Sequence, residues 1–370
     1  MKATQPSYMK QEKVPQFKNV LIRVPNWLGD SMMATPTVAS VKKMFPKSRL
    51  TILGKSVFTD FWKNFHGVDD FIVYEKGLRG FWNNVSRLKR AKIDAALVMP
   101  GSFSSAFSLF AAEIPVRIGW GGEGRDLFLT HVVPHPNPRQ KHLVWEYLEL
   151  ARKGFDAPGI AGKTAQLQAP VTKDAERELR RVWDDNGVSG KNFIALAPGA
   201  TYGEAKRWPL HYWKELIGKL LKERTESILI LGGLEEAAYL EPLLDVGASS
   251  KDSSRLHLLA GRTSPTILAA MLAHCKILIT NDTGPMHVAA AAGTPTVALF
   301  GSTSPTWTRP FGIGHEVIYH QVECSPCFQR TCPIGYLCLN KISVEEVFRA
   351  AQKQLKNPHK IQPEKLPKNF

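Results

Sequence analysis

Residues 276–300 contain the sequence pattern that most constrains the fold of this chain. An apolar run at 276–279 predicts a buried strand, a polar turn follows, an alanine-rich stretch to Gly293 predicts a helix, and 295–300 predicts a second strand. Asp282 or Thr283 can cap this helix, and Gly284 lets the backbone approach a ligand closely. The free N–H groups at a helix start favour an anion such as phosphate, although an ordinary capped helix would have the same pattern.

The same alternation of strand and helix extends over most of the chain. Apolar runs predict strands at 19–24, 50–53, 71–74, 95–99 and 116–118, and again at 193–197, 227–231, 256–259, 276–279, 295–300 and 317–319. Helical segments separate them, so we expect an α/β fold with two parallel sheets and helices on both faces. Ligands of such sheets bind at the carboxyl ends of the strands, and two sheets facing each other would form a cleft there.

The expected domain boundaries follow from breaks in this alternation. We expect a basic tail at 1–18, an N-terminal domain at 19–165, a C-terminal domain at 166–345 with a cysteine-rich segment at 323–338, and a helix end with a basic tail at 346–370. Residues 121–140 are rich in Gly and Pro and are expected to be irregular. The chain after Asn357 is expected to be disordered.

The formal net charge of +15 suits an anionic partner such as nucleic acid, lipid head groups or a phosphorylated glycan. A solvated basic surface without a specific partner would have the same composition. No apolar run reaches the roughly 20 residues of a membrane span, and residues 1–18 lack a signal-peptide core, so we expect a cytoplasmic protein.

Asp30 follows the first predicted strand, at the expected mouth of the cleft. A carboxylate in that position can serve as a general base, and it can equally cap the following helix. No intact GxGxxG follows the first strand and no GxxxxGK[ST] is present, which disfavours a dinucleotide oxidoreductase or a P-loop protein.

The loop 197–209 follows another strand and combines a flexible backbone with the hydroxyl of Thr201 and the cations Lys206 and Arg207. Such a loop suits a diphosphate, because cations offset the charge that builds up on a leaving group, although a plain surface loop remains an alternative. Glu235 and Glu236 end the next strand; an acid there can hold ribose hydroxyls or can simply favour the start of a helix.

Four cysteines, Cys324, Cys327, Cys332 and Cys338, lie within 15 residues. Four thiolates so close together could bind zinc or an iron–sulfur cluster, or could remain reduced structural thiols. The fifth, Cys275, is expected in the core.

The chain resembles the ADP-heptose:lipopolysaccharide heptosyltransferases of glycosyltransferase family 9, and most closely heptosyltransferase II. The resemblance covers about residues 19–350 and rests on NVLIRVPNWLGDSMMATP, RIGWGGEGRDLFLT, APGATYGEAKRWP and TNDTGPMHVAAAAGTPTVALFGSTSPTWTRP. It implies the GT-B fold, in which two Rossmann-like domains enclose the active site. It also implies inverting transfer of heptose from ADP-heptose to a Kdo2-lipid A-type acceptor that already bears a heptose.

The resemblance also implies roles for individual residues. Asp30 would be the base, and Lys206 with Thr201 would contact the donor phosphates. Glu236 or Glu235 would hold the ribose. The donor-binding turn and helix would contribute the following residues: Asp282, Thr283, Gly284 and His287. No cofactor is required for the chemistry, and the protein would contact the inner face of the inner membrane peripherally.

Three alternatives remain open at this point. The chain could be another GT-B transferase of the lipopolysaccharide core, including heptosyltransferase I or III. It could be a sugar epimerase on the same two-domain fold. It could also be a basic nucleic-acid-binding protein, although no recognisable nucleic-acid module is present.

Overall fold

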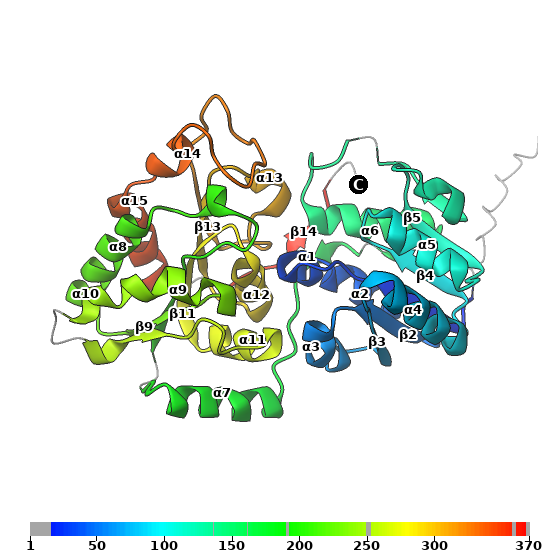
Figure 1. Ribbon diagram of the computed structural model, residues 1–370, viewed down its shortest axis with the longest axis horizontal. Helices are drawn as coiled ribbons and strands as arrows, with labels where there is room; N and C mark the ends of the chain where they lie inside the picture. Colours follow the sequence, from blue (N-terminus) through cyan, green and yellow to red (C-terminus); the bar gives the residue numbers. More distant parts are fainter. Residues whose placement is uncertain are drawn as a thin grey trace, which may run out of the picture.

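The computed structural model describes residues 16–135, 137–160, 162–189, 192–248, 253–356 and 360–367. They form two α/β domains that lie side by side (Figure 1). Each domain contains a six-stranded parallel sheet, and the two sheets have the same strand order, in which the first strand of the domain lies third and the fourth lies beside it. The predicted alternation of strand and helix is confirmed.

The N-terminal sheet has the order β3-β2-β1-β4-β5-β6. Its strands are β1 (Asn19–Arg23), β2 (Arg49–Gly54), β3 (Asp70–Val73), β4 (Ala95–Val98), β5 (Val116–Trp120) and β6 (His131–Val133). The helices of this domain are α1 (Leu28–Met33), α2 (Thr35–Met44), α3 (Thr59–Lys63), α4 (Gly77–Ala91), α5 (Phe103–Ala111) and α6 (Leu143–Gly154). The central strands are buried on both faces, which explains their continuous apolar sequences.

The C-terminal sheet has the order β10-β9-β8-β11-β12-β13. Its strands are β8 (Phe193–Ala197), β9 (Ser227–Ile230), β10 (Leu256–Leu258), β11 (Cys275–Asn281), β12 (Thr296–Phe300) and β13 (Glu316–Tyr319). Its helices are α7 (Lys173–Asp185), α8 (Leu210–Glu223), α9 (Ala237–Leu240), α10 (Asp245–Ala248), α11 (Pro265–Ala273), α12 (Gly284–Ala292), α13 (Pro305–Thr308), α14 (Leu337–Asn340) and α15 (Val344–Lys356).

The helices α1 and α12 face each other at the centre of the molecule and join the two domains (Figure 1). Two glycines permit this close approach. A Cβ atom on Gly29 would lie 2.6 Å from Cδ2 of His287, and a Cβ atom on Gly284 would lie 3.0 Å from Cδ2 of Leu28. The helix α12 ends at Gly293, whose φ of +80° is a conformation that glycine adopts without strain.

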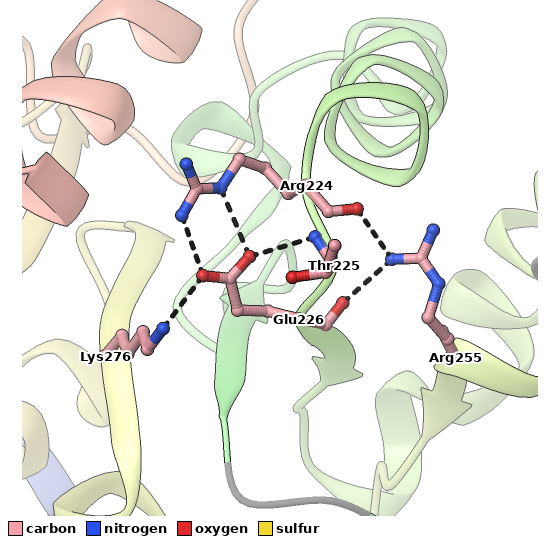
Figure 2. Close-up of polar contacts among 5 residues, drawn as sticks. All are labelled: Arg224, Thr225, Glu226, Arg255 and Lys276. Carbon is pink, nitrogen blue, oxygen red and sulfur yellow. Dashed lines mark hydrogen bonds and ion pairs between the residues drawn. The ribbon is translucent and has the colours of Figure 1, made fainter.

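The amino-terminal edge of the C-terminal sheet is held by a polar network around the buried carboxylate of Glu226 (Figure 2). Arg224 donates to both carboxylate oxygens, at 3.1 and 2.7 Å, and Lys276 of β11 lies 3.1 Å from one of them. Arg255 donates to the backbone carbonyls of Arg224 and Glu226. This network lies at the opposite end of the strands from the candidate site, so its role is structural.

The prediction of disorder after Asn357 is wrong for residues 360–367, while 357–359 and 368–370 lie outside the described residues. The strand β14 (Glu364–Lys365) pairs antiparallel with β7 (Thr164–Ala165) in the segment between the domains. Glu364 also accepts hydrogen bonds from both terminal nitrogens of Arg309 and from the amide of Gly312. These tertiary contacts order a sequence that has little apolar character of its own.

Two further expectations concern the ends of the domains. Residues 121–140, expected to be irregular, contain the edge strand β6. The expected N-terminal tail lies mostly outside the described residues, but the ring of Phe17 packs between Phe45 and Phe155 at centroid distances of 5.5 and 5.9 Å. Cys275, expected in the core, is buried at the start of β11.

Candidate active site

An ion pair forms the centre of the candidate site. Nζ of Lys206, in the short helix η4 (Glu204–Lys206) that follows β8, lies 2.6 Å from Oδ2 of Asp282, directly after β11. The side chains are 14% and 4% exposed, so the pair is shielded from water. Thr303 donates a second hydrogen bond, at 2.7 Å, to the same oxygen of Asp282.

The two turns that carry this pair are fixed to each other by Asn281. Its side-chain amide donates to the carbonyl of Pro198 at 2.6 Å, and its side-chain oxygen accepts from the amide of Trp208 at 3.2 Å. Because Asn281 is fully buried, these bonds connect the carboxyl ends of β8 and β11 rigidly. The predicted phosphate loop and the predicted donor-binding turn are therefore neighbours.

Asp30 approaches this pair from the N-terminal domain. It lies in the first turn of α1, whose N-cap position is occupied by Trp27, so Asp30 does not cap the helix. Burial of its carboxyl raises the pKa of Asp30 to about 6; the charge of Lys206 acts in the opposite direction, and that of Asp282 raises it further. The contact between α1 and α12 thus brings a carboxyl group of one domain within electrostatic range of a cation of the other.

His287 lies on α12 at the same contact and is 3% exposed. Burial lowers its pKa to about 4, so the imidazole is neutral at pH 7. Its Nδ1 is buried and has no hydrogen-bond partner among the described residues.

Thr283 occupies the N-cap position of α12 and Gly284 is the first helical residue, but the side chain of Thr283 makes no capping hydrogen bond. The backbone N–H groups at the start of this helix therefore donate no hydrogen bond to the side chain of the N-cap residue, as an anion-binding helix start requires.

The two glutamates after β9 differ in their surroundings. Glu235 is exposed, whereas Glu236 is buried and accepts a hydrogen bond of 2.8 Å from the amide of Gly233. Its other oxygen, Oε1, has no partner among the described residues and faces the backbone of Gly199, where a Cβ atom would lie 2.4 Å away. Thr201, further along the same loop, is exposed. Of the two acids, Glu236 is the one directed at the phosphate loop.

The predicted zinc or iron–sulfur site receives no support from the structure. Within the described part of the chain, no group of three or more His, Cys, Asp or Glu side chains could hold a metal ion. Cys324 is exposed and Cys338 is buried, while Cys327 and Cys332 lie between these extremes. Burial raises the pKa of the Cys338 thiol, and Cys332 accepts a hydrogen bond from the amide of Tyr336.

The cysteine-rich segment instead supports the phosphate loop. Tyr202 donates to the carbonyl of Phe328 at 2.6 Å, and the amide of Ala205 donates to the carbonyl of Arg330 at 2.9 Å. The guanidinium of Arg330 also lies over the ring of Tyr202. The segment 323–338 thus helps to fix the loop that carries Lys206, a role that the spacing of its cysteines does not indicate.

Arg125 is a further candidate site residue, which the sequence pattern did not single out. It begins the short helix η2 (Arg125–Phe128) after β5, is 7% exposed, and donates from Nε to the carbonyl of Trp120 at 2.6 Å. Its Nη1 has no partner among the described residues and points toward the start of α5, since a Cβ atom on Gly101 would lie 2.9 Å from it. Its place within RIGWGGEGRDLFLT was the signal that could have identified it.

The arrangement described above, with two Rossmann-like domains and polar groups meeting between the carboxyl ends of their sheets, is the GT-B fold. The sequence model of Glycosyltransferase family 9 (heptosyltransferase) matches residues 82–337, more than half of the chain. The chain belongs to this family and is a glycosyltransferase.

Several similar proteins are heptosyltransferases. Lipooligosaccharide heptosyltransferase 2 of Campylobacter jejuni is 28% identical over 344 residues, covering 92% of this chain and 99% of the relative. Lipopolysaccharide heptosyltransferase 2 of Salmonella typhimurium is 30% identical over 315 residues, covering 82% and 90%. The solved structure of Escherichia coli ADP-heptose lps heptosyltransferase II superimposes with a TM-score of 0.76 at 28% identity, covering 91% of this chain and 98% of that one.

Proposed function

We propose that this protein transfers L-glycero-D-manno-heptose from ADP-heptose to the first heptose of the lipopolysaccharide inner core, with inversion at the anomeric carbon. The names of the similar proteins support the donor and the acceptor class. The observation that carries the mechanism is the contact of α1 with α12, which brings Asp30 within electrostatic range of the Lys206–Asp282 pair of the opposite domain. An inverting transfer needs a base on one side of the sugar and the departing diphosphate on the other.

Asp30 is the proposed general base. The acceptor hydroxyl oxygen forms the new bond to the anomeric carbon, the bond from that carbon to the β-phosphate oxygen breaks, and ADP leaves with the electron pair. The hydroxyl proton passes to the carboxylate of Asp30. A pKa of about 6 leaves this carboxylate ionised at neutral pH while making it more basic than an exposed aspartate.

The charge on the departing ADP is offset by groups of the C-terminal domain. Lys206 supplies a cation, held in place by Asp282, and the start of α12 at Thr283 and Gly284 supplies backbone N–H groups. His287, neutral and packed on α1, positions this helix against the acceptor domain.

The rest of the donor has candidate partners on the same domain. The free oxygen of Glu236 can accept hydrogen bonds from ribose hydroxyls, and Thr201 can contact the diphosphate from the neighbouring loop. Glu235 is exposed and is not proposed to contact the donor.

The acceptor is lipid-linked and rich in carboxylates and phosphates. We assign Arg125 to one of these anionic groups, because its buried guanidinium has an unpaired nitrogen at the carboxyl edge of the acceptor domain. None of the helices in the described residues is long and apolar enough to cross a membrane. Because the proposed acceptor is lipid-linked, we propose peripheral contact with the cytoplasmic face of the inner membrane.

The test is ADP release from ADP-heptose in the presence of Kdo2-lipid A with or without a first heptose attached. We expect release only with the heptosylated acceptor. Release with the bare acceptor would assign the protein to the first heptose transfer, and silence with both would refute heptosyl transfer to the inner core. Detection of an epimerised nucleotide sugar without any acceptor would replace the proposal by an epimerase.

A further inference from the structure

The N-terminal domain exposes a group of large apolar side chains over α4, α5 and η2, which we call the apolar ridge. Its members are Leu78, Trp82, Phe103, Phe110 and Leu127. Leu78 and Leu127 are 79% and 82% exposed, and Trp82 is 60% exposed. Isolated exposed apolar residues are ordinary, but several on adjoining elements indicate a surface that meets another apolar phase.

Contacts between aromatic rings connect the elements that carry the apolar ridge. The ring of Phe81 lies 5.2 Å from that of Trp82 and 5.3 Å from that of Phe107, which joins α4 to α5. The ring of Phe107 lies 5.9 Å from Phe103 and 5.1 Å from Phe128, which joins α5 to η2. The exposed members therefore stand on a rigid aromatic layer rather than on separate flexible loops.

The apolar ridge is bordered by positive charge. Between residues 76 and 92 the chain has six Lys or Arg residues and no acid. Arg79 lies three residues before Trp82 and eleven before Arg90, so these cations share one side of α4 with the tryptophan. Glu75 pairs with Arg87 and Glu113 with Lys89, while Asp126, next to Leu127, accepts a hydrogen bond from the amide of Gly122. An aromatic and aliphatic surface beside exposed cations is complementary to an anionic lipid interface.

The position of the apolar ridge relates it to the candidate site. Leu78 begins α4 after β3, Phe103 begins α5 after β4, and Leu127 follows β5, so all three lie at the carboxyl edge of the sheet. Asp30 lies at the same edge, after β1. Arg125 lies two residues before Leu127 on η2, and its Nη1 points toward Gly101, two residues before Phe103 of the apolar ridge.

We propose that the apolar ridge docks on an anionic phospholipid bilayer, with Leu78, Trp82 and Leu127 entering the interface and the cations of α4 contacting lipid phosphates. The inference rests on the proposed lipid-linked acceptor and assigns the surface that meets the membrane. Docking there directs the carboxyl edge of the acceptor domain, and so Asp30, toward a saccharide that projects from the bilayer. A second copy is a poorer occupant, because a two-fold contact through α4 would bring its cations together.

The test is flotation of the full-length protein with vesicles of phosphatidylethanolamine and phosphatidylglycerol, compared with phosphatidylcholine vesicles. We expect binding to the anionic vesicles that weakens with added salt. The double variant Leu78→Ser/Trp82→Ser should bind the anionic vesicles at least about tenfold more weakly, because both side chains are exposed and their loss removes the inserted apolar area. Ile334→Ser/Leu337→Ser, at exposed apolar residues of the C-terminal domain, is the matched control and should bind as the unmodified protein does.

Activity provides a second readout that separates this inference from the proposed function. The Leu78/Trp82 variant should retain transfer to a deacylated, water-soluble acceptor and lose transfer to the same saccharide embedded in vesicles. Unchanged vesicle binding by this variant, or no binding by the unmodified protein, would overturn the docking surface. A second contrary outcome is that light scattering finds the unmodified protein dimeric and the variant monomeric while vesicle binding is unchanged. The apolar ridge would then be a contact between two copies of the chain. If no acceptor is heptosylated at all, the proposed function fails, while flotation still decides the docking surface.

Discussion

Gly29 of α1 lies directly against the imidazole of His287 of α12, with no space for even a methyl group between them. The contact fixes the distance between the proposed base and the donor-binding helix. Gly29→Ala should therefore force α1 and α12 apart, destabilise the fold by about 1–3 kcal/mol and reduce turnover. Thermal unfolding and ADP release measure the two effects. Gly218→Ala on α8, whose added Cβ would meet only Val246 at 3.8 Å, is the control and should leave both unchanged or raise stability slightly.

Asp30→Asn should reduce turnover by about 10²–10⁴-fold while ADP-heptose binding, measured by calorimetry, stays within a factor of a few. In the unmodified enzyme kcat/KM should fall as the pH drops below about 6, since protonated Asp30 cannot accept the hydroxyl proton. Asp60→Asn, at an exposed first-turn acid of α3 in the same domain, should keep full activity. Retained turnover in Asp30→Asn would remove Asp30 from the role of base.

Lys206→Ala leaves the buried carboxylate of Asp282 without its cation. We expect weaker donor binding, slower turnover and a loss of stability on the order of 3 kcal/mol, because the unpaired charge is 4% exposed. Lys214→Ala removes a lysine that pairs with Asp245 at the surface, and it should change stability by less than about 1 kcal/mol. A Lys206→Ala protein that loses only acceptor affinity would contradict its place at the donor phosphates.

Three buried histidines make stability depend on pH. Burial lowers the pKa of His142 to about 3 and those of His287 and His315 to about 4, from an ordinary 6.5. The unfolded chain therefore binds more protons than the folded protein below pH 6.5, and stability falls as the pH falls from 6.5 toward 4. The raised pKa of Asp30 acts in the opposite direction, but it is one group against three.

Urea unfolding at pH 7 and pH 4.5 should differ by several kcal/mol for the unmodified protein. Replacing His142 by Gln should reduce this difference, whereas replacing the exposed His66 by Gln should not. Equal stability at the two pH values would contradict burial of the neutral imidazoles.

The Glu226 network makes a separate prediction about acid stability (Figure 2). Burial alone would raise the pKa of Glu226, but hydrogen bonds from Arg224 and Lys276 outweigh it and lower the pKa to about 2 from an ordinary 4.5. Its stabilisation is therefore present above pH 4.5 and is lost as the pH falls toward 2. Glu226→Gln should lower the free energy of unfolding at pH 7 by about 2 kcal/mol and leave turnover unchanged, whereas Glu223→Gln at an exposed position should do neither.

The strands that were predicted correctly are those whose signal is local. Strands such as β1 and β8 are buried on both faces, so their sequences are uninterrupted apolar runs. The strand β6 escaped prediction because it is a short strand within a stretch rich in Gly and Pro, and β14 escaped because Glu364 and Lys365 form a strand only by pairing with β7. Pairing partners distant in sequence cannot be read from a local pattern.

The candidate site also divides into features with a local sequence signal and features that depend on packing between distant segments. The topology of parallel sheets placed Asp30, Lys206 and Asp282 at carboxyl strand ends, which the alternation already predicted. The choice of Glu236 over Glu235 and the direction of Arg125 depend on side-chain packing between separate loops. The cysteine spacing suggested a metal, whereas the structure shows backbone contacts of that segment with the phosphate loop, which no spacing rule encodes.

The segment 360–367 gives the molecule a second, non-covalent attachment between the stretch that joins the domains and the C-terminal domain. The chain leaves the N-terminal domain through the stretch that contains β7, and after α15 it returns to pair with that same stretch, while Glu364 remains bound to Arg309 of the C-terminal domain. A two-domain enzyme with one linker can twist and bend freely about it. Here the two paired strands hold the stretch between the domains against the C-terminal domain, and we expect this attachment to limit twisting of Asp30 away from Lys206.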